Sequence, residues 1–453
     1  MLDYDDYLFE DELEAGSKDS GLASPQEDEF DHQSRTAGGK SDLAATKTIT
    51  PVERLSQSMS VKKEMLDFNS FGLRPELVRA LQTRHYTRPA PAQVTGLPVA
   101  LSGCDLLLQS KEGSGKTAVY CLSTLQAMKF GNRIEILVIV PTRELAVQVA
   151  REFQEFSEFL PECRVHSLYG GLGAIRDRII LQHKLPNIIV GTPGRLLALL
   201  KGSQLNLRGV THFIVDECDK LLYPGPGGMS HEVRELLDAC PEDRQVMMFT
   251  GTINRDEAER ERRFLKLMHC PRLLLVEDPS ELVLTGVSQF RVTLDAEARK
   301  NRKLLELLDR INYNQVVLFV NTIERCQALC DLLNEKGLLC IPFHSGMSQI
   351  ERLRNFNMFR NFDRRILVAT DLMGRGIDYE FVTCIINYDV PWTAEIYLHR
   401  VGRTGRMERQ GIAVSLCVTD NKSDDVNTLL MVERRYLILV PELPDDLDTG
   451  ILL

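Results

Sequence analysis

Short apolar runs alternate with longer segments of helical periodicity along most of this chain. The first five runs cover residues 105–110, 134–140, 187–192, 211–217 and 246–252. Segments between them, such as residues 142–160, repeat apolar residues at helical spacing. Strands that are apolar throughout and alternate with helices are typical of a parallel sheet covered by helices on both faces. The pattern therefore predicts an α/β fold.

The alternation pauses and then begins again in the second half of the chain. Residues 272–286 carry acids, proline and glycine, which suggests a linker. Five further apolar runs cover residues 315–322, 338–345, 364–371, 384–390 and 411–418. We predict a first α/β unit over residues 59–276, a linker over 277–285 and a second α/β unit over 286–453.

The first residues of the chain differ from the rest in charge and composition. Residues 1–60 hold 14 Asp and Glu against five Lys and Arg, which leaves 50 acids and 49 bases in the remainder. Few apolar residues and excess charge are typical of disorder, so we predict a disordered acidic tail over residues 1–58. The nearly neutral remainder can still present a basic face, so the net charge of −10 does not exclude nucleic acid.

Composition also limits where such a chain works. No apolar stretch approaches the roughly 18 residues of a membrane span, and the acidic start differs from the positive start of a signal peptide. The 11 cysteines are scattered without a CxxC pair, which argues against a disulfide framework and a zinc site. We expect a soluble intracellular protein that does not bind membranes.

The stretch "SKEGSGKT", Ser110 to Thr117, follows an apolar run and precedes a helical pattern. Its glycines let backbone N–H groups surround phosphate oxygens, while Lys116 reaches the β and γ phosphates and Thr117 offers a hydroxyl to Mg²⁺. The usual pattern starts with glycine, and this one starts with Ser110. The loop predicts a nucleoside triphosphate site.

A second stretch, "FIVDECD", ends an apolar run in acids. A buried strand that ends in a solvated turn is the alternative interpretation. With a phosphate loop in the same unit, we predict instead that Asp216 holds Mg²⁺, largely through water, and that Glu217 polarises the attacking water.

The second unit contains the cationic stretch "HRVGRTGR", residues 399–406. Arg403 and Arg406 are candidates to stabilise the transferred phosphate, because the planar guanidinium pairs with its oxygens. A solvated basic loop is the alternative. The stretch 368–378, with Gly376 and Asp378, also ends an apolar run, and together these motifs place ATP between the two units.

In order along the chain, these motifs resemble those of the DEAD-box ATP-dependent RNA helicases, and "HYTRPAPAQ" (85–93), "PTRELA" (141–146) and "TGT" (250–252) resemble further motifs of that family. The resemblance covers about residues 60–453 and implies two tandem RecA-like domains that use ATP and Mg²⁺. It implies that Tyr86 stacks on adenine and Gln93 bonds its edge. The predicted catalytic residues are Lys116, Asp216, Glu217, Arg403 and Arg406. The predicted ATP contacts are Tyr86, Arg88, Gln93, Ser110, Lys111, Glu112, Gly113, Ser114, Gly115, Lys116, Thr117, Gly376 and Asp378, with Thr117 and Asp216 at the metal.

The resemblance also implies contacts to the RNA backbone, which would be independent of sequence. They are assigned to Pro141, Thr142, Arg143, Gly170, Gly171, Thr192, Gly194, Arg195, Thr370 and Asp371. Thr250, Thr252 and His399 are assigned to coupling between hydrolysis and RNA remodelling.

Cys218 makes the acidic motif DECD, which is similar to a narrower branch of ATPases that act in pre-mRNA splicing and nuclear mRNA export. That branch implies a nuclear location and export and splicing proteins as partners, and we expect a monomer. Gly251 departs from the family's alanine, and we expect this to weaken coupling. Gly402 and Thr404 resemble the general family more than the branch.

Two functions remain open at this point. One is an RNA-stimulated ATPase that remodels RNA duplexes or ribonucleoproteins. The other is an ATP-gated RNA-binding clamp and assembly scaffold with little unwinding. A nonhelicase phosphate-loop ATPase is a third interpretation, which would leave the motifs of the second unit unexplained.

Overall fold

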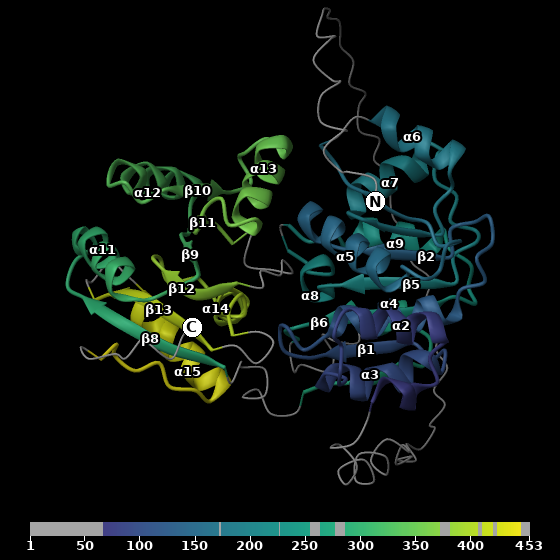
Figure 1. Cartoon of the computed structure of the whole chain (residues 1–453), viewed down its shortest axis with the longest axis horizontal. Coiled ribbons are helices and arrows are strands. Elements are labelled where there is room, and N and C mark those ends of the chain that lie inside the picture. The colour runs from purple at the N-terminus through teal and green to yellow at the C-terminus, as the bar shows by residue number, and fades with distance from the viewer. Residues whose placement is uncertain are drawn as a thin grey trace, which may run out of the picture. The chain divides into compact units, whose positions relative to one another are not determined.

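The apolar runs form two parallel sheets in the computed structural model of this chain (Figure 1). The structure describes residues 67–171, 174–225, 227–253, 263–276, 286–371, 381–405, 410–419 and 424–444. The predicted tail and linker lie outside these described residues. Both sheets, and with them the two predicted α/β units, lie within one compact region of the chain, Val61–Leu453.

The first sheet has seven strands in the order β3-β4-β2-β5-β6-β1-β7, and every pair of neighbours is parallel. Its strands are β1 (Leu106–Gln109), β2 (Ile136–Ile139), β3 (Val165–Leu168), β4 (Ile188–Gly191), β5 (His212–Asp216), β6 (Gln245–Thr250) and β7 (Arg272–Leu274). Gln109 pairs with Thr250 and Asp216 pairs with Phe249. The residues that follow β1, β5 and β6 therefore meet at one edge of the sheet, where ligands bind in open α/β sheets.

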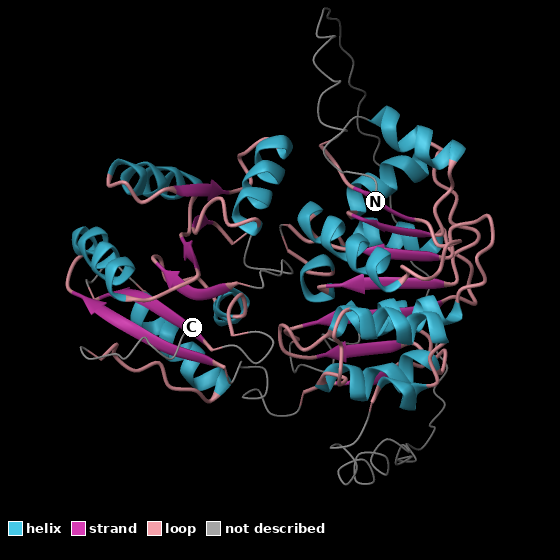
Figure 2. Cartoon of the chain, in the orientation of Figure 1, coloured by secondary structure: helices cyan, strands magenta, loops and turns pink. Residues whose placement is uncertain are grey.

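Both faces of this sheet are buried under helices, as Figure 2 shows. Alternate strand residues face opposite ways, so Ile136 and Val138 join one apolar cluster while Leu137 and Ile139 join the other. One face carries α2 (Pro75–Thr83), α3 (Pro91–Leu101), α4 (Lys116–Ala127) and α5 (Arg143–Phe156). The other carries α6 (Ala174–His183), α7 (Pro193–Lys201), α8 (Cys218–Leu221) and α9 (Ser230–Asp238), and two 3₁₀ turns are η2 (Phe68–Phe71) and η3 (Leu265–Leu267).

The second sheet has six strands in the order β10-β11-β9-β12-β13-β8, again with parallel neighbours only. Its strands are β8 (Val287–Leu294), β9 (Gln315–Phe319), β10 (Cys340–Phe343), β11 (Ile366–Ala369), β12 (Val382–Asn387) and β13 (Gly411–Val418). One face packs on α13 (Gln349–Arg360), α14 (Ala394–Val401) and α15 (Asp425–Tyr436). The other packs on α11 (Lys300–Arg310), which follows η5 (Glu297–Arg299), and on α12 (Ile323–Glu335).

Helices begin at the strand ends through side-chain caps. Thr142, Thr322 and Thr393 each accept a hydrogen bond from the backbone N–H three residues on, which fixes the starts of α5, α12 and α14. Ser348 and Glu351 form a reciprocal capping box at the start of α13. These caps place the residues of each motif at the edge where the strands end.

The predicted fold, two parallel sheets each covered by helices, is confirmed. The sequence did not predict β3, β7 and β8. Residues 272–274, which lie within the first predicted α/β unit and before the predicted linker, form β7 beside β1. β3 and β8 carry polar residues such as His166, Ser167 and Gln289, because edge strands are only partly buried, and so they lack an apolar run.

Candidate functional site

The phosphate loop connects β1 to α4 at the strand edge. Gly113 and Gly115 have φ values of 66° and 86°, in the left-handed region that suits glycine. Lys116 Nζ donates to the carbonyl oxygens of Ser110 and Lys111 at 2.7 and 2.8 Å. The Ser110 hydroxyl donates to the Ser114 hydroxyl at 2.7 Å. The loop therefore turns its lysine back over its own backbone, and Lys116 and Thr117 open α4.

Gln93 lies against this loop. It is 1% exposed, its Oε1 accepts from Ala90 N at 2.8 Å, and its Nε2 donates to Gly115 O at 3.4 Å. A Cβ at Gly115 would lie 2.4 Å from Gln93 Nε2, so this close approach requires glycine. Tyr86 is half-buried between Phe68 and Phe156, with ring centroids 6.4 and 5.7 Å away. Arg88, which precedes Gln93 in the sequence, is exposed.

The two predicted carboxylates end β5 and are both buried. Tyr120 of α4 donates its hydroxyl to Asp216 Oδ2 at 2.9 Å, and the backbone N–H of Glu217 donates to Asp216 Oδ1 at 2.9 Å. Burial raises the pKa of Asp216, although Lys116 and the Tyr120 hydrogen bond act in the opposite direction. Glu217 has φ of 50°, a left-handed conformation that costs a non-glycine residue about 1 kcal/mol. Such strain is typical of residues that a site holds in place.

The hydroxyl and carboxylate oxygens of Thr117 and Asp216 are ligands that Mg²⁺ prefers, and Mg²⁺ commonly keeps several waters and phosphate oxygens. Within the described residues no group of three or more His, Cys, Asp or Glu could hold a metal ion by itself. The residues present therefore fit a magnesium ion that is bound together with a nucleotide.

Thr250 and Thr252 both contact the acidic motif. Thr250 Oγ1 donates to Asp219 Oδ1 and Thr252 Oγ1 donates to Asp219 Oδ2, each at 2.9 Å. Gly251 lies between them without a left-handed φ. The two hydroxyls thus join the end of β6 to the turn after β5.

His399 of α14 and Arg403, which follows that helix, reach the phosphate loop. His399 Nδ1 lies 2.9 Å from Glu112 Oε1, and Arg403 Nη2 lies 3.0 Å from Glu112 Oε2. Both basic side chains are buried, at 2% and 1% exposed. The structure therefore brings Arg403, the first of the two candidate catalytic arginines, to the phosphate loop. Arg406, Gly376 and Asp378 lie outside the described residues.

The predicted RNA residues of the first unit gather near the start of α5. Pro141 and Thr142 are buried, and the Arg143 guanidinium lies against Gly170 and Gly171. A Cβ at Gly171, where φ is 92°, would lie 2.3 Å from Arg143 Nη1. Arg143 Nη1 also donates to Gln349 Oε1 at 2.7 Å. Gly171 is thus the position at which a side chain would clash with the arginine, whereas a Cβ at Gly170 would lie in ordinary contact, 3.5 Å from Arg143 Nη2.

The remaining RNA candidates lie at helix and strand ends. Arg195 of α7 pairs with the buried Asp177, with Nε 2.8 Å from Oδ2. Thr192 and Gly194 stand at the N-terminus of α7, where nothing lies within 4 Å of a Cβ placed on Gly194. Thr370 and Asp371 follow β11 and are partly exposed.

Several functional candidates were missed by the sequence analysis. Gln349 contacts Arg143, and Arg352 Nη2 pairs with Glu144 Oε1 at 2.5 Å. Arg400 is fully buried and donates to Asp371 Oδ1 at 2.6 Å and to Asn321 Oδ1 at 2.8 Å. These partners lie 29 to 208 residues apart in the sequence, so local sequence patterns do not reveal the pairs.

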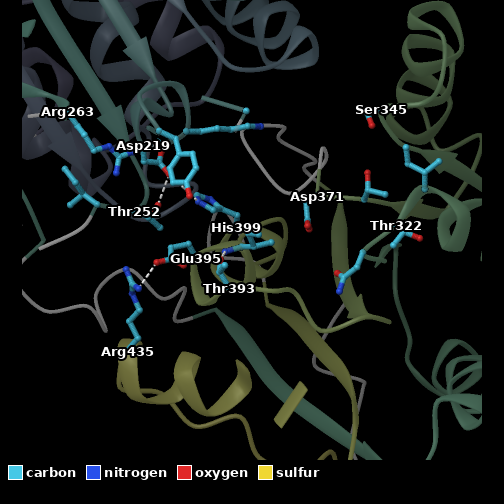
Figure 3. A pocket seen from close by; sticks show the side chains of 18 of the residues that line it. Asp219, Thr252, Arg263, Thr322, Ser345, Asp371, Thr393, Glu395, His399 and Arg435 are labelled. Carbon is cyan, nitrogen blue, oxygen red and sulfur yellow. Dashed lines mark hydrogen bonds and ion pairs between the residues drawn. The ribbon is translucent and has the colours of Figure 1, made fainter. Parts of the chain in front are cut away.

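A cavity of roughly 1000 Å³ opens beside the threonine motif, and Figure 3 labels the side chains around it. Its lining includes Asp219 and Thr252 of the first unit and Thr370, Asp371 and His399 of the second. The lining includes no residue of the phosphate loop. The cavity is therefore lined by residues predicted for coupling and RNA contact, and not by the phosphate loop. No helix in the described part of the chain is both long and apolar enough to cross a membrane.

The fold and the phosphate site define a two-sheet phosphate-loop nucleoside triphosphatase. Residues 90–260 match the DEAD/DEAH box helicase family, and residues 299–408 match the helicase conserved C-terminal domain. The chain belongs to the DEAD/DEAH box helicase family, and it is an ATP-dependent RNA helicase of the DEAD-box type.

Relatives and solved structures agree with this assignment. The chain is 41% identical over 382 residues to the human ATP-dependent RNA helicase DDX39A. This match covers 84% of this chain and 87% of that protein. The chain is 43% identical over 384 residues to the DEAD-box ATP-dependent RNA helicase 56 of Oryza sativa subsp. japonica, with the same coverage. The structure of S. cerevisiae Dbp5 bound to RNA and ADP BeF3 is 27% identical with a TM-score of 0.75, over 84% of this chain and 96% of that chain.

The predicted family is confirmed by these matches. The similarity to DDX39A agrees with the narrower resemblance to the DECD-box branch.

Proposed function

We propose that this helicase remodels short RNA duplexes or ribonucleoproteins in pre-mRNA splicing and nuclear mRNA export, and that it works in the nucleus as a monomer. The resemblance of its DECD motif to the splicing and export branch supports this role, as does the similarity to DDX39A. Export and splicing proteins would supply specificity, because contacts to the RNA backbone carry no sequence information.

The observation that carries the catalytic part of the proposal is the contact of Arg403 with Glu112, within the phosphate loop that contains Lys116. Asp216 accepts a hydrogen bond from Tyr120 of the helix that follows this loop. We assign phosphate binding to Lys116 and the loop backbone, and orientation of the attacking water to Glu217. Arg403 and Arg406 would stabilise the charge that develops on the transferred phosphate.

The other predicted contacts keep their roles in this proposal. Tyr86, Arg88 and Gln93 would bind the adenine, and Gly376 and Asp378 would complete the ATP site. Thr117 and Asp216 would hold Mg²⁺, which supplies positive charge to the phosphate oxygens. Arg143, Arg195 and the strand-end residues Thr370 and Asp371 would bind the RNA backbone.

A comparison of wild type with Glu217→Gln tests the enzyme. We expect this variant to keep ATP and RNA bound while RNA-stimulated phosphate release falls by about a hundredfold or more. Strand displacement on a short RNA duplex, measured in the same samples, distinguishes a remodelling enzyme from a clamp. Phosphate release without any displacement by the wild type would favour the ATP-gated clamp.

The cellular role needs a separate experiment. The tagged protein should be found in the nucleus, and its complexes formed with a nonhydrolysable ATP analogue should contain spliceosomal or export proteins and RNA. A cytoplasmic distribution with no such proteins would contradict the splicing and export role, while leaving the helicase activity untouched.

A further inference from the structure

Glu112 is an acidic side chain within a loop that binds phosphate. Such loops attract anions through backbone N–H groups, a helix N-terminus and a lysine. A carboxylate at this place repels the triphosphate, so its presence requires an explanation. The explanation lies in the two groups that the carboxylate contacts.

The two oxygens of Glu112 bind two different groups of the second unit. Oε1 lies 2.9 Å from His399 Nδ1, and Oε2 lies 3.0 Å from Arg403 Nη2. Arg403 is fixed further by its Nε, which donates to the carbonyl oxygen of His399 at 2.9 Å. The side chains of Glu112, His399 and Arg403 are 15%, 2% and 1% exposed, so solvent screens their attraction only weakly.

Two glycines leave room for this side chain. A Cβ at Gly402 would lie 2.9 Å from both Cβ and Cγ of Glu112, and a Cβ at Gly251 would lie 3.2 Å from Glu112 Oε1. Gly251 is the position at which this chain departs from the alanine of the family it resembles. Glycine at position 251 therefore accommodates Glu112, because the Cβ of an alanine there would press against the carboxylate.

The electrostatic surroundings keep the carboxylate ionised. Burial by itself raises the pKa of Glu112, but Arg403, the His399 hydrogen bond and Lys116 together hold that pKa well below its usual range. An ionised carboxylate and a phosphate oxygen are alternative partners for the same guanidinium. Glu112 therefore binds the Arg403 guanidinium through a negatively charged oxygen, as a γ-phosphate would.

We propose that Glu112 is a positioning residue that substitutes for the γ-phosphate. Its carboxylate competes with the γ-phosphate for Arg403 and His399 at the phosphate loop, and ATP must displace it to reach Arg403. The proposal rests on the role of Arg403 given under the proposed function. Its consequence is that the chain weakens its own ATP affinity.

The neutral, nearly isosteric variant Glu112→Gln tests this competition. Titration with a fluorescent ATP analogue in the absence of RNA should show affinity that is about fivefold tighter or more, the lower end of typical coupling between sites. The KM for ATP should fall in parallel, and kcat should change less. Glu158→Gln, at an exposed position of the same unit, is the matched control. Unchanged or weaker binding by Glu112→Gln would overturn the proposal.

A second pair of variants keeps the test independent of folding. Glu112→Ser removes the carboxylate without adding bulk, and it should tighten ATP binding as Glu112→Gln does. Gly251→Ala should alter ATP affinity in the wild-type background and much less in the Glu112→Ser background, because serine leaves the space that Cβ needs. Equal effects of Gly251→Ala in both backgrounds would contradict the inference that Gly251 leaves room for the Glu112 carboxylate.

Arg403→Ala separates this inference from the proposed role of the arginine. Normal turnover by Arg403→Ala would remove the arginine from catalysis and the proposal with it. If turnover is lost in Arg403→Ala while Glu112→Gln leaves ATP affinity unchanged, the catalytic assignment stands and the competition alone is wrong.

Discussion

The hydroxyl of Tyr120 donates a hydrogen bond to Oδ2 of Asp216 across 2.9 Å, although the two residues lie 96 positions apart in the sequence. Tyr120 is fully buried on α4, in contact with Phe153 and Phe249. The phosphate-loop helix therefore carries the group that orients Asp216, the carboxylate proposed to bind the metal, at the end of β5. One rigid helix positions both Lys116 and Asp216.

This relationship predicts the effect of Tyr120→Phe. The hydrogen bond from this hydroxyl to Oδ2 lowers the pKa of Asp216. Removal of the hydroxyl should therefore raise that pKa further, because burial then meets less opposition. We expect the Mg²⁺ concentration for half-maximal ATPase to rise about tenfold or more, in line with the loss of about 1.5–3 kcal/mol for one hydrogen bond to a charged group. Tyr313→Phe in the second unit is the control, and an equal Mg²⁺ requirement in the two variants would contradict the positioning role.

The two bonds that Asp219 accepts from the threonine motif predict a separation of hydrolysis from strand displacement. Thr250→Val keeps the shape of the side chain and removes the hydroxyl that contacts Asp219. We expect duplex unwinding per ATP hydrolysed to fall about fivefold, while RNA-stimulated ATPase changes less than about twofold. Both rates are measured on one duplex, with the surface variant Thr83→Val as control. A parallel fall in both rates would assign Thr250 to bond cleavage.

Cys218 can be tested as a packing residue. Burial raises the pKa of its thiol well above the usual range, and the neighbouring Asp219 and Asp216 act in the same direction. A thiol that stays protonated is a poor nucleophile. Cys218→Ala should therefore keep ATPase activity within about twofold and lower the free energy of unfolding by about 1 kcal/mol, because one buried sulfur is lost. A tenfold loss of kcat in a stable variant would show that the thiol takes part in chemistry.

The parts that the sequence predicted share a local cause. Ser110–Thr117 and Asp216–Glu217 each follow an apolar strand, and the ends of parallel strands meet at one edge of the sheet. Pattern and topology alone therefore bring these groups together. The register that aligns Gln109 with Thr250 places the threonine motif at the same edge.

The parts that the sequence missed depend on tertiary contacts. Arg352 is buried on α13, and its pairing with Glu144, 208 residues away in the sequence, arises only because α13 meets α5. Glu112 was assigned to ATP from its position in the loop, without any indication of its contacts to His399 and Arg403. The edge strands β3 and β8 were not predicted for a related reason, since partly buried strands alternate polar and apolar residues and so lack a continuous apolar run.

His212 at the start of β5 predicts a dependence of stability on pH. Burial lowers its pKa from 6.5 to about 4, with a smaller opposing effect from Glu135. Between these values the unfolded chain binds a proton that the folded chain does not, so this residue lowers stability as the pH falls through the window. His212→Asn should lessen the loss of unfolding free energy between pH 7 and pH 4.5 by on the order of 1–2 kcal/mol.

Chemical denaturation at several pH values measures this effect. His231→Asn, at a histidine whose side chain is 80% exposed on α9, serves as the control. The same pH profile in both variants would show that His212 is not a source of the acid sensitivity.

The last prediction concerns the ion pair between Arg352 and Glu144. Glu144 begins α5 beside Arg143, its side chain is fully buried, and Arg352 of α13 is 8% exposed. Removal of one partner from a buried pair leaves the other charge without compensation, which costs about 2–5 kcal/mol in binding. Because the pair joins α5 of the first unit to α13 of the second, the cost should appear wherever RNA requires that contact.

We therefore expect Arg352→Met to raise the RNA concentration for half-maximal ATPase at least about tenfold, which corresponds to about 1.4 kcal/mol. The double variant Glu144→Gln/Arg352→Met should recover part of that loss, since it removes the uncompensated charge. Arg354→Met, two residues along the same helix and exposed, is the matched control. RNA titrations of ATPase activity measure all three variants. Equal shifts for Arg352→Met and Arg354→Met would mean that general loss of positive charge, and not the contact with Glu144, determines RNA affinity.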